Sequence, residues 1–504
     1  MILLDGSSLT LDDLVAIAYD EAPVSLADTA RARVRAAREV VDAAAQLETP
    51  AYGINTGFGN FAYVRIPHES LAELQLNLLR SHAAGVGEPL SVPVVRATMA
   101  LRANVLAKGF SGIRVETLEL LLALLNHRVH PVVPSRGSVG ASGDLAPLAH
   151  LALVLIGEGE AWHTGEREPG AGALARIGVA PASLAAKEGL ALINGTQPST
   201  ALLGLALAGA LQLARTADIA AALSIDGLQG STKPFDPRIH EARGLAGQRE
   251  SADNLRNLLA DSVINQAHAN CGRVQDAYSM RCAAQVHGTA REAFAFARRM
   301  FDAEANAATD NPMVFADARE IVSGGNFHGA PVSVAADVLC LGLAQLATIS
   351  ERRSDRLVNP SSSGLPAFLT RHGGLQSGLM MAQVTAAALT SELKTIAHPA
   401  SVDTIPTSGN TEDHVSMSMG AALKAARALE IARQVIAVEL LCACQAIDLL
   451  APLTSSASLM RVHETIRAHV PTLERDRPPS PDIARITAMI EAGDLERACA
   501  LKVK

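Results

Sequence analysis

The sequence predicts a mainly α-helical protein built around a bundle of long helices. Of its 504 residues, 49% are hydrophobic but only 3% are aromatic. Such a core must consist of Ala, Leu, Val and Ile, which suits closely packed helices. Apolar residues recur with helical spacing over long stretches, and strand-like segments such as 320–323 are few and short. No repeat with a period of about 20–50 residues is visible, which argues against a solenoid.

The first third of the chain predicts several shorter helices. The sequence TLDD at 10–13 resembles a capping box and predicts a helix to about residue 19. Further helices are expected at 27–47, 71–81, 115–125, 148–158 and 184–192. A short extended run is expected at 129–134, and the segment 163–172, rich in Gly, Glu and Arg, indicates a solvent-exposed excursion.

The remainder of the chain predicts long apolar helices. They are expected at about 198–225, 282–303, 330–357, 375–397 and 415–450. We therefore expect a single domain over 1–485. Its N-terminal part would run to about residue 197, its bundle would occupy 198–485, and a helical tail would follow at 486–504.

Charge and targeting signals narrow the class of protein. The net charge of −8, from 43 basic and 51 acidic residues, is mild and argues against nucleic acid or an anionic membrane as the main partner. The N-terminus lacks the pattern of a secretory signal, and the most apolar run, 201–214, is shorter than a bilayer span. We expect a soluble, cytoplasmic protein. Six cysteines in so long a chain indicate neither a disulfide framework nor a metal site.

The stretch GSVGASGDLAPL at 137–148 carries the most distinctive chemistry. Gly143 has no Cβ, so its amide nitrogen can reach the carbonyl carbon of Ala141 through backbone angles closed to other residues. Ring closure with loss of water, followed by loss of the Ser142 hydroxyl, would leave 4-methylidene-imidazole-5-one (MIO). Its exocyclic methylidene is an electrophile that no unmodified side chain offers. A helix beginning near Asp144 would increase its reactivity.

The same stretch has a simpler interpretation and excludes two others. It can be a glycine-rich turn that opens a helix, with Ser142 or Asp144 as the N-cap and Pro147 in the first turn. A nucleophile elbow is excluded because Asp144 stands where that motif requires glycine. The glycines, spaced three residues apart, match neither a dinucleotide-binding fingerprint nor a P-loop.

Further segments combine with this stretch into a recognisable set. They are the glycine-rich loop 52–60 with Tyr52, which we expect to be mobile, NGTQ at 194–197, QDAYSMR at 275–281, GGNFH at 324–328, SERR at 350–353 and EDHVSM at 412–417. With these motifs in this order, the chain resembles the aromatic amino acid ammonia-lyases, the MIO enzymes, from its first helix to about residue 485.

The resemblance implies several properties. It implies a mainly helical homotetramer whose active sites combine residues of different subunits, and an MIO group formed autocatalytically from Ala141-Ser142-Gly143 without added metal or nucleotide. Tyr52 would be the base that removes the β proton of the substrate, although a phenol with a pKa of about 10 would need that pKa lowered. Tyr278 would lie beside the ring.

The resemblance also assigns substrate-binding roles. Arg281 would bind the carboxylate with its planar fork, Asn194 and Gln275 would donate to the ring oxygen or orient the substrate, and Phe327 would cap the electrophile. Each has a simpler alternative, namely a surface ion pair for Arg281 and a buried structural side chain for the others.

Two residues point to the substrate. Members acting on phenylalanine or tyrosine carry Phe-Leu or His-Leu where this chain has Ser81-His82, and Glu412 stands where the histidine-specific members have glutamate. His82 and Glu412 would hydrogen-bond an imidazole, so we expect elimination of ammonia from L-histidine to give trans-urocanate. Gly409 and Thr411 depart from the usual Ala and Gln, which bears on the finer pocket shape.

Two other functions stay open at this point. One is a phenylalanine or tyrosine ammonia-lyase, or an MIO aminomutase that returns ammonia to the β carbon. The other is a non-catalytic helical scaffold, which would have no need of the Ala-Ser-Gly tripeptide, Tyr52 and Arg281 together.

Overall fold

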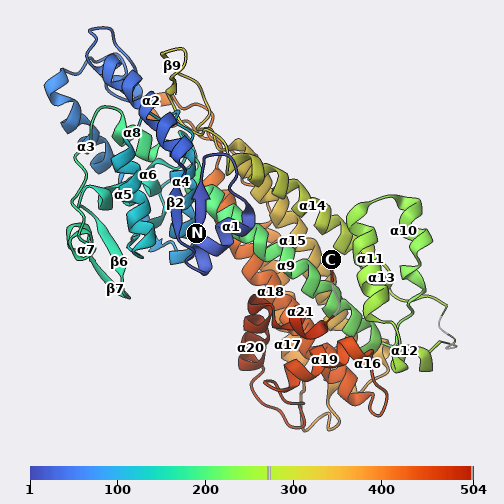
Figure 1. The fold of residues 1–504 in the computed structure, drawn as a ribbon. Coiled ribbons are helices and arrows are strands. Elements are labelled where there is room, and N and C mark those ends of the chain that lie inside the picture. The colour runs from blue at the N-terminus through green and yellow to red at the C-terminus, as the bar shows by residue number, and fades with distance from the viewer. Residues whose placement is uncertain (270–271, 273, 501–502) are drawn as a thin grey trace. The chain divides into compact units, whose positions relative to one another are not determined.

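The computed structural model describes residues 1–269, 272, 274–500 and 503–504, and it confirms a mainly helical fold (Figure 1). The chain forms two compact units. The first comprises Met1–Leu205, Arg298–Asp337 and Pro399–Leu423, and the second comprises Ala206–Ala297, Val338–His398 and Lys424–Lys504. The division into a domain over 1–485 and a helical tail stays a prediction.

The first unit contains eight helices that lie wholly within it. They are α1 (Leu11–Tyr19), α2 (Asp28–Ala45), α3 (Leu71–His82), α4 (Val92–Ala107), α5 (Val115–Asn126), α6 (Leu145–Leu155), α7 (Gly170–Arg176) and α8 (Glu188–Ile193). Helix α1 has the predicted capping box, in which Thr10 Oγ1 accepts from the Asp13 backbone N–H at 3.1 Å. Helix α6 begins directly after Asp144, as expected.

Helix α4 was not predicted from the sequence, although it is 16 residues long and almost wholly buried. Fourteen of its residues are buried, so it shows no amphipathic pattern that would reveal a helix. Its buried Arg96 donates to the carbonyls of Ile17 at 2.7 Å and Leu125 at 3.1 Å, at the ends of α1 and α5. A cation at the C-terminal ends of two helices satisfies carbonyls that lack helical partners.

The strands of the first unit are short. β1 (Ile2–Leu4) pairs in parallel with β2 (Val24–Leu26), and the other pairs are antiparallel: β3 (Val86–Pro89) with β5 (Pro134–Arg136), β6 (Glu160–His163) with β4 (His130–Pro131) and β7 (Glu166–Pro169), and β8 (Met313–Phe315) with β9 (Glu320–Val322). The predicted solvent exposure of 163–172 is confirmed for most of the segment. Its residues 163–169 belong to the β6–β7 hairpin, which lies against α7, and residues 170–172 begin α7 (Figure 1).

Long helices confirm the predicted bundle. α9 (Gln197–Gly227), α14 (Ala283–Glu304), α15 (Ala330–Val358) and α18 (Ser418–Leu449) each contribute residues to both units. The second unit adds α10 (Pro237–Arg243), α11 (Ala246–Leu258), α12 (Val263–Ala267), α13 (Tyr278–Arg281), α16 (Pro360–Ser363), α17 (Met380–Ile396), α19 (Ala457–Arg467), α20 (Ser480–Ala492) and α21 (Asp494–Cys499). By length and composition α9 and α15 could cross a membrane, but 78% and 67% of their apolar windows are buried, as in core helices.

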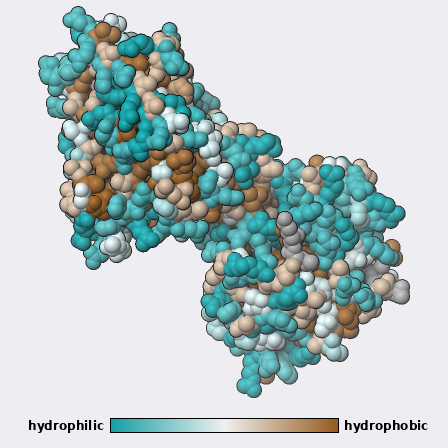
Figure 2. All heavy atoms as spheres, in the orientation of Figure 1, coloured by the Kyte–Doolittle hydropathy of each residue, from teal (hydrophilic) through white to brown (hydrophobic). Residues whose placement is uncertain are grey.

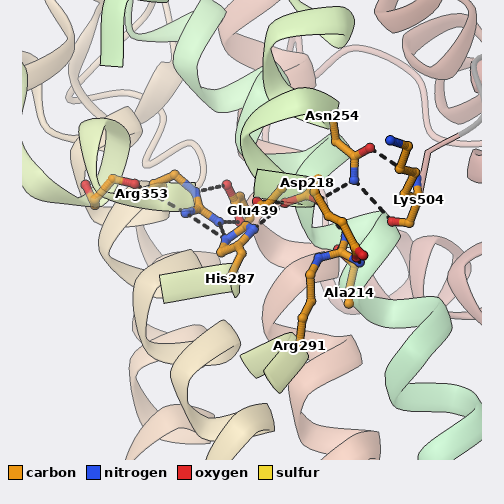
Figure 3. A network of polar contacts seen from close by, with 11 residues as sticks. Ala214, Asp218, Asn254, His287, Arg291, Arg353, Glu439 and Lys504 are labelled. Atoms are coloured by element: carbon orange, nitrogen blue, oxygen red, sulfur yellow. Dashed lines mark hydrogen bonds and ion pairs between the residues drawn. The ribbon is translucent and has the colours of Figure 1, made fainter. Parts of the chain in front are cut away.

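A buried polar network joins the helices of the second unit (Figure 3). Asp218 on α9 accepts from Asn254 on α11 at 2.8 Å and from Arg291 on α14 at 2.7 Å. Burial alone would raise the pKa of Asp218, but Arg291 and His287 hold it below its ordinary value. Arg353, from the SERR motif, pairs with Glu439 of α18, with Nη2 to Oε2 at 2.9 Å. Arg353 therefore has a structural role.

Candidate active site

A cavity of about 770 Å³ in the first unit gathers side chains from distant parts of the sequence. They come from the loop after α2, the end of α3, the turn before α6, the end of α8, and the segment between 408 and 412. Five of the predicted site residues line it together: Tyr52, His82, Ser142, Asn194 and Glu412.

The loop that carries Tyr52 is held in the core. Residues 53–57 are buried, and the Asn55 side chain bonds the backbone of Ala51 at 2.7 Å and of Thr49 at 3.0 Å. This segment is therefore not an ordinary surface loop, and its mobility stays a prediction. Its hydrogen bonds fix the path of the backbone from which Tyr52 enters the cavity.

The Ala-Ser-Gly turn requires glycine at Gly143 and Gly140 for steric reasons. Gly143 has a φ of +74°, and a Cβ added there would lie 2.3 Å from the carbonyl oxygen of Gly195. The Asp144 backbone N–H donates to that same oxygen at 2.7 Å. At Gly140, with a φ of +68°, a Cβ would lie 2.2 Å from Ser416 Oγ. The turn therefore has a left-handed backbone that glycine adopts without strain, in keeping with the expected ring closure through the Gly143 nitrogen.

We expect Gly143→Ala to lower the stability of the protein more than Gly178→Ala. Both glycines have a φ of +74°, but nothing lies within 4 Å of a Cβ at Gly178. The two variants share the cost of the left-handed backbone, and only Gly143→Ala adds a clash with backbone that cannot move cheaply. The extra loss should be about 2 kcal/mol. Unfolding in urea would measure it, and equal losses would contradict this account of the turn.

The polar contacts of Ser142 fit the ring chemistry. Its Oγ donates to Glu412 Oε1 at 2.8 Å, and Glu412 Oε2 accepts from Thr407 Oγ1 at 2.7 Å. Asn194 Nδ2 donates to the backbone oxygen of Ser142 at 3.3 Å. That oxygen is the carbonyl that stays in an MIO ring, whereas the carbonyl oxygen of Ala141 and the Ser142 hydroxyl are lost. Asn194 thus donates to the oxygen that such a ring would keep.

Arg102 holds Asn194 in place and was missed in the sequence. Its buried guanidinium donates to the carbonyls of Asn194 at 2.8 Å and Ala191, and to Gln197 Oε1 at 2.7 Å. These contacts fix the junction of α8 and α9, where an amide side chain was expected. The sequence did indicate that Arg102 has a special role, because it lies in a long apolar run. A charge buried there requires several hydrogen-bond partners.

The buried carboxylate of Asp144 links the turn to α9. It accepts from Ser138 Oγ at 3.0 Å and from the Ser199 backbone N–H at 2.8 Å, while its side chain makes no capping bond to α6. The interpretation of Asp144 as a side-chain N-cap is therefore wrong. Burial raises its pKa, and the hydrogen bonds from Ser199 and Ser138 oppose that shift.

Burial shifts the pKa values of Tyr52 and His82 in opposite directions. It raises the pKa of Tyr52, with a smaller contribution from Glu412 and an opposing hydrogen bond with the Gly59 backbone. The lowered phenol pKa that a base would need is not present in the single chain. Burial lowers the pKa of His82, opposed by the Leu78 carbonyl and Glu412. The Leu78 carbonyl accepts a hydrogen bond from His82 Nδ1–H at 2.9 Å. In the neutral ring, Nε2 then carries no proton and is an acceptor.

The other predicted site residues do not line this cavity. Gln275, Tyr278 and Arg281 belong to the second unit, where the Arg281 guanidinium lies 4.7 Å from the centre of the Tyr278 ring. The Tyr278 side chain is 70% exposed, and Gln275 is also exposed. Phe327 belongs to the first unit and is half-buried. In the described part of the chain, no group of three or more His, Cys, Asp or Glu side chains is placed to hold a metal ion.

Comparisons with known proteins agree in family. A sequence model of the family described as aromatic amino acid lyase matches residues 9–468. The chain is 54% identical to a histidine ammonia-lyase of Myxococcus xanthus, covering 98% of this chain and 97% of the relative. The crystal structure of histidine ammonia-lyase from Trypanosoma cruzi superposes with a TM-score of 0.92 at 45% identity, covering 99% and 94% of the two chains. A tyrosine aminomutase from Streptomyces globisporus gives a TM-score of 0.95 at 37% identity, with full coverage of both chains.

Proposed function

The chain belongs to the aromatic amino acid lyase family, and we propose that it eliminates ammonia from L-histidine to give trans-urocanate. The observation that carries the proposal is the meeting of His82 and Glu412 with Ser142 in one cavity. These two side chains offer polar partners to an imidazole beside the tripeptide that would form the electrophile. The relatives at 50–55% identity that are named histidine ammonia-lyase support the same substrate.

An MIO group formed from Ala141-Ser142-Gly143 would supply an electrophile for the substrate amine, which makes nitrogen a better leaving group. Asn194 Nδ2 donates to the Ser142 oxygen and would stabilise negative charge that develops there. The Asn194 Oδ1 atom is buried and has no hydrogen-bond partner among the described residues. It is therefore available as an acceptor for a substrate N–H.

Tyr52 would remove the β proton of the substrate. Its phenol lines the cavity with Ser142, and its side chain is packed edge-on against Phe58 with 6.4 Å between ring centres. Since burial raises its pKa, the phenolate form becomes available only as the pH rises or as a cation approaches. Arg281 from another copy of the chain would be one such cation.

Imidazole recognition follows from the tautomer of His82. With Nδ1–H donating to Leu78, Nε2 can accept the N–H of a substrate imidazole, and the Glu412 carboxylate is a second acceptor in the same cavity. A benzene ring has no N–H to donate and would leave the His82 Nε2 acceptor unpaired, which costs about 1–3 kcal/mol. This asymmetry is the basis of the proposed preference for histidine.

We expect His82→Leu to reduce kcat/KM for L-histidine by roughly 10- to 100-fold and to raise the relative rate with L-phenylalanine. The leucine removes the acceptor and leaves an apolar wall suited to a benzene ring. Steady-state rates with both amino acids measure the change, and His127→Leu, at an exposed position after α5, is the matched control. If the ratio of the rates with L-histidine and L-phenylalanine is unchanged in His82→Leu, His82 does not determine substrate specificity.

The four remaining predicted residues would complete the site in an assembly. We infer a homotetramer in which Gln275, Tyr278, Arg281 and Phe327 reach a cavity of another copy. On the face drawn in Figure 2, apolar atoms form separate patches among hydrophilic ones. Met381 on α17 is 56% exposed and Leu375 is 89% exposed, which favours burial against another subunit. We also propose a cytoplasmic location, without nucleic acid or membrane partners.

An aminomutase is the second candidate, because a tyrosine aminomutase superposes on the whole chain. Such an enzyme would return ammonia to the β carbon. Chromatography of the products separates the two activities, since a β-amino acid would identify the mutase and free ammonia with conjugated acid would identify the lyase.

A further inference from the structure

We propose that Glu412 also acts in forming the MIO group, by passing a proton to the Ser142 hydroxyl as that hydroxyl leaves. The inference rests on the proposed function, because it concerns the formation of the same electrophile. It gives Glu412 a role that precedes any binding of substrate.

The Glu412 carboxylate is held at the leaving hydroxyl. Its Oε1 lies 2.8 Å from Ser142 Oγ, and its Oε2 accepts from Thr407 Oγ1 at 2.7 Å. The Thr407 backbone N–H also donates to the Glu412 carbonyl at 2.9 Å, so both ends of this short turn are tied together. Glu412 is half-buried, and its carboxylate has little freedom to turn away.

The other carboxylate near the turn is occupied elsewhere. Asp144 Oδ1 accepts from Ser138 Oγ, and Asp144 Oδ2 accepts from the Ser199 backbone N–H. Neither bond involves the Ser142 hydroxyl. Asn194 contacts the Ser142 carbonyl oxygen, which stays in the ring. Glu412 is therefore the acidic group placed to act on the bond that must break.

The chemistry balances without an oxidant or a reductant. In the first water loss, the Gly143 nitrogen bonds to the Ala141 carbonyl carbon, and that carbonyl oxygen leaves with the protons of the Gly143 and Ser142 nitrogens. In the second, the Cα–H electron pair of Ser142 becomes the Cα=Cβ bond, and the Cβ–Oγ pair leaves with oxygen. The Glu412 carboxylate takes up a proton from solvent and gives it to Oγ, so that water leaves rather than hydroxide, and the Cα proton passes to solvent.

The test follows the mass of the whole purified chain at matched times after synthesis. We expect the wild type to become lighter by two waters. Glu412→Gln should complete the second loss on the order of 100-fold more slowly, so chains lacking one water or none persist. Thr407→Val keeps the carboxylate but frees it, and should slow the loss less. Asp413→Asn, an exposed neighbour, is the control and should mature at the wild-type rate.

The outcomes separate the two proposals. If the wild-type chain loses no water, no MIO group forms, and both the MIO chemistry and the proposed function are contradicted. A wild type and a Glu412→Gln variant that both lose two waters at the same rate would overturn the role of Glu412 in ring formation and leave the proposed function standing. Circular dichroism checks that each variant is folded, and if Glu412→Gln is not, the rate of the folded Thr407→Val variant decides.

Discussion

Replacing Ser142 with alanine is expected to abolish both the near-UV absorbance of the MIO group and turnover of L-histidine. The methylidene carbon is Cβ of Ser142, and without a hydroxyl to expel no Cα=Cβ bond can form. The loss should be on the order of 10⁴-fold or more, as for other enzymes that lose a covalent catalytic group. The fold should persist, because the Ser142 side chain contributes one hydrogen bond, to Glu412.

The measurement compares the difference spectrum and the rate of ammonia release for Ser142→Ala and the wild type. Ser135→Ala, in β5 shortly before the turn, is the control and should keep both signals. A Ser142→Ala protein that turns over L-histidine would show that the tripeptide is only a glycine-rich turn that opens α6.

Tyr52→Phe is expected to reduce kcat by roughly 10²- to 10⁴-fold, the usual contribution of a general base. The change removes the phenol oxygen and keeps the ring that packs on Phe58. The two waters should still be lost from the tripeptide, so the variant separates ring formation from catalysis. The pH profile adds a second readout. Since burial raises the pKa of Tyr52, the deprotonated base accumulates as the pH rises, and wild-type activity should increase into the alkaline range.

Steady-state rates between neutral and alkaline pH measure this effect. Tyr63→Phe, at a side chain that is 97% exposed, is the control and should retain the wild-type profile. If Tyr52→Phe keeps the alkaline rise and most of its rate, another group removes the β proton.

The sequence allowed most of the fold to be predicted because its long helices have clear apolar patterns and caps. The expected helices at 330–357 and 415–450 agree with α15 and α18 to within a few residues. Helix α4 was not predicted because nearly all of its residues are buried, so it has no polar face that would reveal helical spacing. The β6–β7 hairpin was not predicted because its short strands are rich in charged residues and lack an alternation of apolar and polar residues.

For the site, the residue chemistry pointed to the tripeptide, and the family resemblance pointed to its surroundings. The sequence predicted glycine at 143 from the needs of ring closure. The structure adds a steric reason, because a Cβ at this position would clash with the Gly195 carbonyl. Arg102 was recognisable as an arginine in an apolar run, but its partner Asn194 lies 92 residues away and could not be named from the sequence. Thr407 was out of reach because its bond to Glu412 depends on the conformation of the turn between them. The direction of the Tyr52 pKa shift depends on burial, which no local pattern reveals.

The central claim is most directly tested by incubating the purified protein separately with L-histidine, L-phenylalanine and L-tyrosine. Near-UV absorbance reports the conjugated acid, and a coupled assay reports ammonia. The account predicts that both appear with L-histidine and that neither appears with the other two amino acids. Product from L-phenylalanine or L-tyrosine, with none from L-histidine, would contradict the assignment of His82 and Glu412 to imidazole recognition.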